Sequence, residues 1–299
     1  MSVPHEDELA RAFEDERPRL LRVAYSTTGS LAEAEDCVQE SWLRLRRLPD
    51  PGAIRDLRGW LTTVVGRQAL DALGSARSRR ERYVGTWLPE PLVEPAGAEA
   101  SDPAERVTLD ESVSMALLVM LDELSPAQRT AFLLHDVFGL PFDQVAEVVG
   151  RTPAAVRQLA SRARRHIEQS RPHTPAPRAE QWRLVHAFAA ACREGDLEAL
   201  VRLLDPEVTW RGDGGGLVAS LPGVVRGARD VARGLIALGP LPAGTSHVVT
   251  VNGAAGLVFY EPEGMVSVAS FTVDGGRITA IDVQRNPEKL TSVRFRQTP

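Results

Sequence analysis

The sequence predicts a multidomain protein in which two all-α domains precede an α+β domain. Apolar residues recur every three to four positions through two long stretches, which is the period of an amphipathic helix. From about residue 181, after one or two more helices, the period changes to two, which is typical of half-buried strands. Two proline-rich stretches without periodicity separate these parts and are expected to be linkers. The expected boundaries are helical domains at 6–82 and 108–171, an α+β domain at 181–291, linkers at 83–107 and 172–180, and a tail at 292–299.

Composition favours an ordinary globular protein that works in a reducing compartment. The chain has 299 residues, of which 43% are hydrophobic and 25% are charged. Cys37 and Cys192 lie far apart and match no metal-ligand or redox spacing, so we expect neither a metal site nor a cofactor. No stretch approaches the roughly 20 apolar residues of a membrane helix, and the acidic N-terminus does not resemble a secretion signal. We therefore expect a cytoplasmic protein.

The net charge of −5 is distributed unevenly along the chain. Residues 66–83 and 151–171 are basic, and residues 89–111 between them are acidic. Two separate basic patches can contact DNA at two places while the whole chain stays soluble.

Start and stop signals support the helices one by one. Ser30 precedes "LAEAEDCVQESW" with Glu33 three residues later, the pattern of a capping box. The stretch "LPDPGAIRDL" interrupts the helical period, and Ser125 followed by Pro126 predicts a new helix start. In the last domain, "VTWRG", "SHVVTVNG" and "AGLVFYE" alternate as strands do, and "DGG" at 274–276 predicts a hairpin.

The stretch "FDQVAEVVGRTPAAVRQLASRARRHI" has the pattern of a helix-turn-helix. Ala146 supplies the small residue where the two helices cross, Gly150 supplies the turn, and Thr152 can cap the second helix ahead of Pro153. An apolar stripe on that helix leaves the basic and polar side chains facing elsewhere, where arginine and glutamine can reach base edges and phosphates. The alternative is a solvated basic face on a bundle helix. The candidate DNA contacts are Thr152, Arg157, Gln158, Ser161, Arg162, Arg164 and Arg165.

The helical part resembles a bacterial RNA polymerase sigma factor of the extracytoplasmic-function (ECF) group. "LDELSPAQRTAFLLHDVFGLPFDQVAEVVGRTPAAVRQLASRARRHI" is similar to region 4 of that family, and "GSLAEAEDCVQESWLRLRRL" followed by "IRDLRGWLTTVVGRQALDAL" is similar to region 2. The resemblance covers roughly residues 8–170, with both signatures in the right order. It implies core RNA polymerase, through its clamp helices and flap, and promoter DNA as partners.

The resemblance also implies roles for individual residues. The polymerase-binding helix would carry Asp36, Gln39, Glu40 and Trp42, although a plain amphipathic helix is the alternative. The downstream promoter element would be melted and bound by Trp60, Thr63, Arg67, Arg77, Arg79 and Arg80. Trp60 could equally belong to the core. The chain reads Gly66-Arg67-Gln68 where the family often has an Arg-Asn pair, which leaves open the residue that reads the flipped base.

Three further motifs resemble the subgroup of these factors that carries a C-terminal SnoaL-like domain, the SigJ-like factors. They are "YVGTWLPEP" (83–91), "DGGG" (213–216) and "NPEKL" (286–290), and the subgroup's third domain is a cone-shaped α+β barrel. They imply regulation in cis by that domain. Each motif also has a purely structural alternative. "YVGTWLPEP" could be a stiff connector, "DGGG" a flexible loop and "NPEKL" a short terminal helix. The residues assigned to interdomain regulation are Tyr83, Trp87, Leu88, Pro89, Asp213, Gly214, Gly215, Gly216, Asn286, Pro287, Lys289 and Leu290.

Two other functions stay open at this point. SnoaL-like cones include cyclases and isomerases that use His/Asp pairs, and the candidates here are Asp205, Asp213, His247 and Asp282, with Trp210 and Tyr260 as lining. Nothing in their spacing brings them together, so we expect no catalytic residues and no enzyme activity. The other alternative is a helix-turn-helix repressor with a ligand-sensing domain, which would bind its operator without polymerase.

Overall fold

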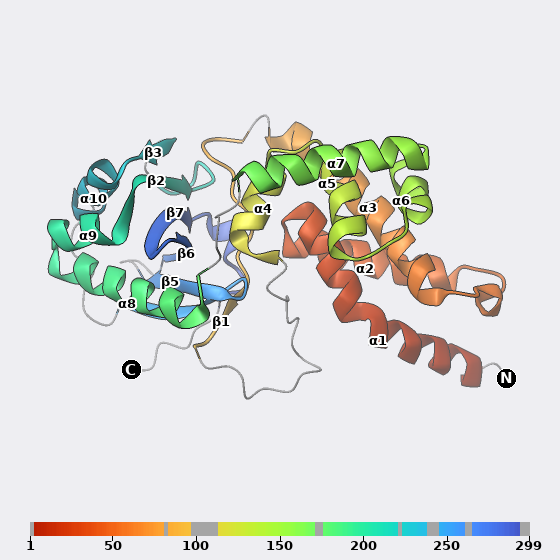
Figure 1. Cartoon of the computed structure of the whole chain (residues 1–299). Helices are drawn as coiled ribbons and strands as arrows, with labels where there is room; N and C mark the ends of the chain where they lie inside the picture. The colour runs from red at the N-terminus through yellow and green to blue at the C-terminus, as the bar shows by residue number, and fades with distance from the viewer. Residues whose placement is uncertain are drawn as a thin grey trace. The chain divides into compact units, whose positions relative to one another are not determined.

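The computed structural model describes residues 3–80, 83–96, 113–170, 176–220, 223–237, 245–260 and 265–293. The chain divides into two compact units. The helical unit comprises Met1–Arg79, Ser101–Ser112 and Met120–Ser170, and the sheet unit comprises Arg80–Ala100, Val113–Val119 and Arg171–Pro299. The predicted fold class, helical domains followed by an α+β domain, is confirmed (Figure 1). Among the described residues no helix is both long and apolar enough to cross a membrane.

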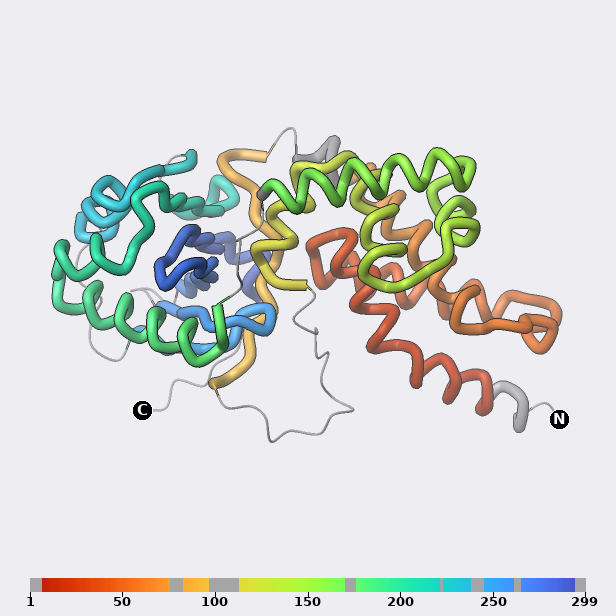
Figure 2. The backbone as a smooth tube through the Cα atoms, viewed as in Figure 1, coloured from red at the N-terminus to blue at the C-terminus, as the bar shows by residue number. Residues whose placement is uncertain are grey.

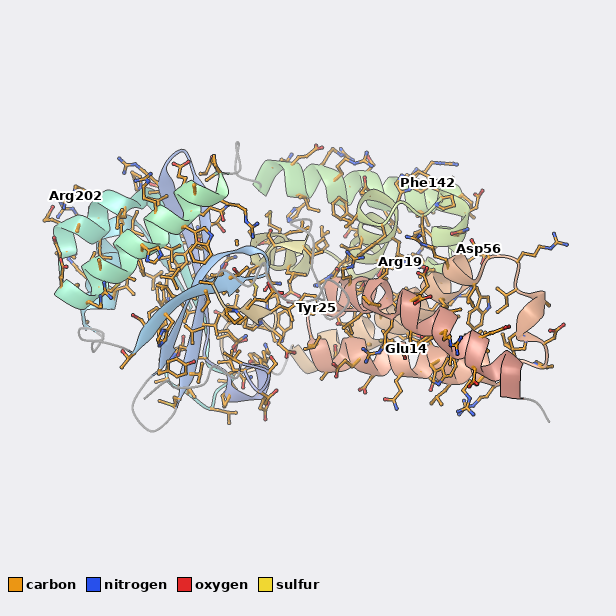
Figure 3. The ribbon with its side chains drawn as sticks, turned by 90° about the horizontal axis from the view of Figure 1, so that it is seen from below. Glu14, Arg19, Tyr25, Asp56, Phe142 and Arg202 are labelled. Atoms are coloured by element: carbon orange, nitrogen blue, oxygen red, sulfur yellow. The ribbon has the colours of Figure 1, made fainter. Side chains whose placement is uncertain are left out.

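The N-terminal part of the helical unit is a set of three long helices. These are α1 (Val3–Thr28), α2 (Leu31–Arg46) and α3 (Leu57–Arg80), with the 3-10 turn η1 (Pro51–Ala53) before α3. Ser30 caps α2 as predicted, because its hydroxyl accepts from the Glu33 N–H at 3.4 Å. Arg19 on α1, labelled in Figure 3, donates to the Thr62 hydroxyl at 2.6 Å and so joins α1 to α3.

The C-terminal part of the helical unit contains the predicted helix-turn-helix. Its elements are α5 (Pro126–Phe132), the π-helical turn η4 (Leu133–Val137), α6 (Phe142–Val149) and α7 (Pro153–Ser170). The helix before them, α4 (Met115–Asp122), is divided between the units, since its residues up to Val119 belong to the sheet unit. Gly150 ends α6 with a φ of 67°, a left-handed conformation that favours glycine. Thr152 caps α7 by accepting from the Ala155 N–H at 3.3 Å. Ser125 and Gln128 form a complete capping box on α5.

The two parts of the helical unit pack against each other through one buried cation and one glycine. Arg129 on α5, only 1% exposed, donates twice to the Ser26 carbonyl near the end of α1, at 2.9 and 3.3 Å. Gly66 on α3 lies so close that an added Cβ would be 3.2 Å from Leu134 Cδ1 and 3.3 Å from Val148 Cγ1. The sequence therefore brings α3, η4 and α6 into direct contact at a residue without a side chain.

The sheet unit holds one mixed sheet of seven described strands in the order β1-β4-β5-β6-β7-β2-β3. The strands are β1 (Val93–Glu94), β2 (Leu204–Asp213), β3 (Val224–Arg226), β4 (Ser246–Val251), β5 (Ala254–Tyr260), β6 (Val266–Asp274) and β7 (Arg277–Gln284). The helices are α8 (Arg178–Glu194), α9 (Leu197–Leu203), α10 (Ala228–Ala237) and the 3-10 turn η6 (Pro287–Lys289). The sheet is open, with β1 and β3 at its edges, and β2 and β7 are its one parallel pair among the described strands.

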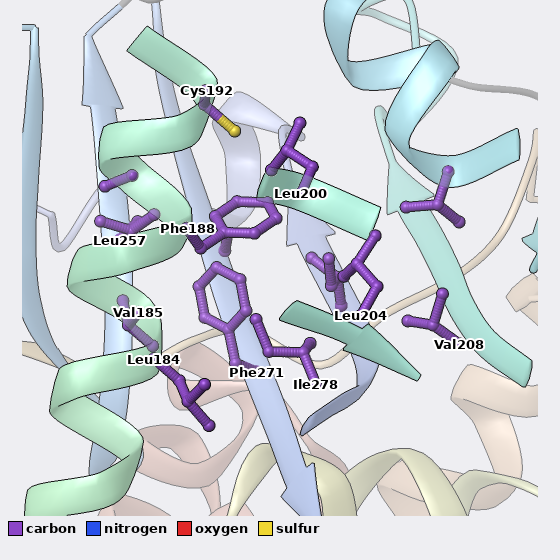
Figure 4. Packing of buried hydrophobic residues seen from close by; sticks show 14 of the residues in the cluster. Leu184, Val185, Phe188, Cys192, Leu200, Leu204, Val208, Leu257, Phe271 and Ile278 are labelled. Atoms are coloured by element: carbon purple, nitrogen blue, oxygen red, sulfur yellow. The ribbon is translucent and has the colours of Figure 1, made fainter. Parts of the chain in front are cut away.

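The helices cover one face of this sheet and form its main core (Figure 4). Phe188 of α8 meets Phe271 of β6 edge to face, with ring centroids 5.0 Å apart. Along β2 and β7, Trp210 and Ile281 belong to this core, so their neighbours point to the second face. That second face carries Arg211, Asp213, Ser270, Asp282 and Gln284.

The second face combines a buried apolar cluster, which contains Val251 and Val268, with polar side chains that are also buried. Asp213, Ser270, Asp282 and Gln284 are all at most 8% exposed. The linker residues Leu88, Pro89 and Pro91 border these side chains, and further along β1 pairs antiparallel with β4. Figure 2 shows this stretch, in light orange, running beside the blue strands. Residues 83–96 of the expected linker are therefore part of the sheet unit.

Candidate functional site

The α7 surface presents every side chain predicted to contact upstream DNA. Thr152, Arg157, Gln158, Ser161, Arg162, Arg164 and Arg165 are all exposed, and the apolar stripe of Val156, Ala160, Ala163 and Ile167 is buried. The arginines are held differently. Arg164 forms an ion pair with Asp136, and the Arg157 guanidinium lies 5.2 Å from the centre of the Phe142 ring. Arg162 makes no hydrogen bond or ion pair with a residue that the structure describes.

The α2 surface presents two of the four predicted polymerase contacts openly. Asp36 and Gln39 are exposed, and Glu40 pairs with Arg44 on the same helix at 3.3 Å. Trp42 differs, because its ring is half-buried and lies 5.0 Å from that of Phe13 on α1. The tryptophan thus has a packing contact within the unit that the three polar residues lack.

The predicted downstream-DNA residues on α3 do not share one environment. Trp60 is half-buried, and the Thr63 hydroxyl donates to the Gly59 carbonyl of its own helix at 3.0 Å. Arg67 is exposed but donates twice to the Glu147 carbonyl of α6, at 3.0 and 3.1 Å. The side chains of Arg77, Arg79 and Arg80 lie outside the described residues.

The third candidate site surrounds Asp213 at the end of β2, where its carboxylate is fully buried. One oxygen accepts from the Tyr83 hydroxyl at 2.5 Å and from the Gly215 N–H at 3.0 Å. The other accepts from the Leu88 N–H at 2.9 Å, from Gln284 at 3.1 Å and from Lys289 at 2.7 Å. Five donors, one of them a cation, balance this buried negative charge.

Lys289 and Asn286 connect the end of the sheet unit to the linker. The Lys289 ammonium also donates to the Leu88 carbonyl at 2.7 Å and lies 4.3 Å from the centre of the Trp87 ring. Asn286 donates to the Tyr83 hydroxyl at 2.9 Å and caps η6 through the Glu288 N–H at 3.0 Å. "YVGTWLPEP" and "NPEKL" therefore share one hydrogen-bonded network.

The glycines of "DGGG" allow this approach. Gly215 and Gly216 have φ values of 64° and 72°, which glycine tolerates best. Asn286 packs on the bare face of Gly215 and Val84 on that of Gly216, while the Gly214 carbonyl accepts from the Leu217 and Val218 N–H groups. The remaining predicted residues complete the site. Gln284 donates to the Pro89 carbonyl, Pro287 opens η6, and Leu290 is buried on the sheet.

Sequence reasoning missed four participants in this site. Gln284 is buried between Asp213 and the linker backbone. In the sequence, only its position in an alternating strand could have indicated that its side chain faces Asp213. Asn252, in the turn between β4 and β5, bonds to the linker backbone. Met115 and Val119 of α4 form a buried cluster with Leu88.

The candidate enzyme residues are engaged in separate contacts. Asp213 is bound by the linker, and the buried Asp282 pairs with Arg211 at 2.6 Å. Burial raises the pKa of Asp282 despite the opposing guanidinium, and burial likewise raises the pKa of Tyr83. His247 is exposed and stacks edge to face on Tyr260, while Asp205 caps its own turn at the Glu207 N–H. No cluster able to hold a metal ion occurs in the described part of the chain.

The chain thus combines a helix-turn-helix that exposes arginines with a sheet domain that binds the linker, an arrangement typical of multidomain transcription factors. The family model "Sigma-70 region 2" matches residues 12–79, and "Sigma-70, region 4" matches residues 114–167. The chain is 43% identical to the ECF RNA polymerase sigma factor SigJ of Mycobacterium tuberculosis, over 93% of this chain and 92% of that protein. It belongs to the ECF family of RNA polymerase sigma factors, which direct promoter-specific transcription initiation.

Two further comparisons cover almost the whole chain. The probable ECF sigma factor SigI of Mycobacterium tuberculosis is 37% identical, over 96% of this chain and 97% of that protein. The crystal structure of Mycobacterium tuberculosis SigJ has a TM-score of 0.79 and 39% identity, covering 94% of this chain and 98% of that one. The likeness therefore extends through the sheet unit as well as the helices.

Proposed function

We propose that this chain binds core RNA polymerase in the cytoplasm and directs it to a two-element promoter, and that the sheet unit regulates this activity in cis. The exposed α2 face, with Asp36, Gln39 and Glu40, would bind the clamp helices, and region 4 would bind the flap. The α7 face would read the upstream element and α3 the downstream element. The sheet unit would act as a binding domain for the linker, with no catalytic step of its own.

The Asp213 network carries the regulatory part of this proposal. It joins two linker residues to the sheet unit through hydrogen bonds to one carboxylate. The five donors are Tyr83 and Leu88 of the linker and Gly215, Gln284 and Lys289. Because the linker and the sheet unit belong to one chain, their effective concentration is high and a modest contact energy suffices to keep the linker docked. A change of a few kcal/mol in the free energy of linker docking then changes the fraction of molecules in which the linker is released.

Run-off transcription with purified core polymerase tests both parts. The informative variant of the full chain is Tyr83→Phe, which removes the hydroxyl shared by Asp213 and Asn286. Hydrogen bonds to charged groups contribute about 1.5–3 kcal/mol each, so the docking equilibrium should shift at least about tenfold. The matched control is Tyr260→Phe, because that hydroxyl is buried in the same unit without a partner among the described residues.

We expect promoter-dependent transcript from the unchanged chain and from Tyr260→Phe in equal amounts. Tyr83→Phe should alter the amount several-fold, and the direction of the change gives the sign of regulation. Equal transcript from all three proteins would contradict regulation by the docked linker. Specific binding to promoter DNA without polymerase, with no transcript, would instead support a self-standing repressor.

A further inference from the structure

Asn252 uses its side chain to hold the linker rather than its own hairpin. It lies in the two-residue turn between β4 and β5, with a φ of 48°, and is only 3% exposed. Asn-Gly is the favoured pair for such a turn, because both residues tolerate a positive φ. The Asn252 side-chain oxygen accepts from the Leu92 N–H at 3.0 Å, and its backbone N–H donates to the Leu92 carbonyl at 2.9 Å.

The other end of the same amide faces the start of region 4. Asn252 Nδ2 donates to the Val113 carbonyl at 3.5 Å, a long hydrogen bond. Apolar contacts reinforce it. Val113 is buried, and Met115 and Val119 on the first turns of α4 pack with Leu88 in a buried cluster. Both flanks of residues 92–113, here named the linker loop, are thus fixed at one edge of the sheet.

This closure changes how far the chain can reach between its two DNA-binding regions. The region 2 match ends at residue 79 and the region 4 match begins at residue 114, so the linker loop lies within the connection. Extended, its twenty-one peptide units would span about 70 Å at ~3.3 Å each. With Leu92 and Val113 at opposite ends of one amide group, this length adds almost nothing to the reach.

We propose that Asn252 is a specificity-determining residue that restricts the distance between the two promoter elements this factor accepts. The inference rests on the proposed two-element promoter recognition. Each base pair added between the elements moves them apart by about 3.4 Å and rotates them by about 35°. The effective concentration of region 4 at its element depends on how well the length of the connection matches the span between the elements. A connection whose loop ends are held together therefore fits few spacer lengths, whereas a connection with a released loop fits several.

The test is transcription from a promoter series whose spacer changes in single base-pair steps. Asn252→Gly keeps a residue suited to the turn and removes both side-chain hydrogen bonds. The unchanged full-length factor should show one spacer optimum with at least about a tenfold loss away from it, and Asn252→Gly should flatten that profile. Asn252→Asp retains the acceptor for Leu92 and loses the donor to Val113, so its profile should lie between the two.

A flatter spacer profile for Asn252→Gly than for the unchanged factor supports the proposal. Identical profiles overturn it, because polymerase alone would then set the spacing. A uniform rise or fall at all spacers also overturns it, because the contact would then control activity and not spacing. If the unchanged factor yields no promoter-dependent transcript, the proposed function itself fails. Hydrogen exchange verifies the variant, since the Leu92 amide should lose protection while the β4–β5 hairpin keeps it.

Discussion

At the scale of single residues, Asp213 shows how a charge can be buried in this sheet. Its two oxygens accept five hydrogen bonds, and Lys289 supplies the compensating positive charge at 2.7 Å. Removing one member of a buried ion pair leaves the other without compensation, and this is costlier than removing both. The same residues that hold the linker therefore also determine the stability of the sheet unit.

We expect Lys289→Met to lower the free energy of unfolding of the sheet unit by about 3–5 kcal/mol, because the Asp213 carboxylate stays buried without its cation. Adding Asp213→Asn should recover part of that loss, since the charge is then removed as well. Urea denaturation of both variants measures the difference. A double variant that is less stable than Lys289→Met would contradict this account.

The α7 arginines differ in how readily they can contact phosphates. Arg162 is exposed and makes no ion pair with a described residue, whereas Arg164 is bound to Asp136. Arg162→Ala should weaken holoenzyme binding to upstream-element DNA about equally for all sequences and reduce the salt slope by about one, as for a lost phosphate contact. Asp136→Asn should act oppositely, because it releases Arg164. Titrations over a range of salt concentrations check both, and an unchanged slope in both variants would rule out phosphate contacts here.

At the scale of elements, α3 packs closely on η4 and α6 because residue 66 is glycine. The neighbouring Arg67 donates to the Glu147 carbonyl of α6, so one turn of α3 contributes both the close approach and the polar contact. A predicted DNA-binding side chain is thus engaged within the helical unit.

Gly66→Ala and Gly66→Leu should behave differently. Alanine gains about 1 kcal/mol in helix propensity, and its Cβ would need only small shifts of two flexible side chains, so near-neutral stability is expected. Leucine overfills the contact and should cost about 1–3 kcal/mol. Urea denaturation would measure this loss of stability, and hydrogen exchange in α6 should become faster. Equal stability of both variants would mean that α3 and α6 are not tightly packed in solution.

The sequence predicts single elements better than the contacts between them. The helical period, the caps at Ser30 and Ser125, and the Gly150 turn are local, and each is confirmed. The strand β1 was not predicted, because two residues in a proline-rich stretch carry no period and gain strand geometry only from β4. The π-helical turn at Leu133–Val137 was also missed, since its apolar residues fit an ordinary helix.

For the candidate site, the motifs named most of the members but not their geometry. Tyr83, Asp213 and Asn286 are separated by long stretches of chain, and only the fold brings them together. Gln284 and Asn252 belong to no motif used here. Their positions in an ordinary strand and an ordinary Asn-Gly turn gave no indication of contacts to the linker.

At the scale of the whole molecule, each unit contains one buried thiol. The reactivity of each thiol can therefore be used to follow the unfolding of its own unit. Burial raises the pKa of Cys37 to about 12, with Glu33 and Asp36 adding to the shift, and burial raises that of Cys192 to about 12. Between the ordinary pKa of 9.0 and about 12, the native thiols stay protonated while the unfolded ones ionise. Unfolding then releases protons, so the free energy of unfolding falls as the pH rises from 9.0 toward 12.

We expect both thiols to resist alkylation at pH 8 in the native protein and to react as their units unfold. Lys289→Met should lower the urea concentration at which Cys192 reacts and leave that of Cys37 unchanged. Mass spectrometry of alkylated peptides measures each site separately. If both thiols respond together in every variant, the two units unfold as one.

The edge strand β1 also has a consequence for protein synthesis. Its residues, Val93 and Glu94, leave the ribosome long before β4, the strand with which they pair, and roughly 200 residues before Lys289. At about 5–20 residues per second, region 2 and its linker exist for some ten to forty seconds before the residues that hold the linker have been synthesised. During each round of translation the nascent chain is therefore an unrestrained precursor, and a chain cut short by premature termination would stay in that form.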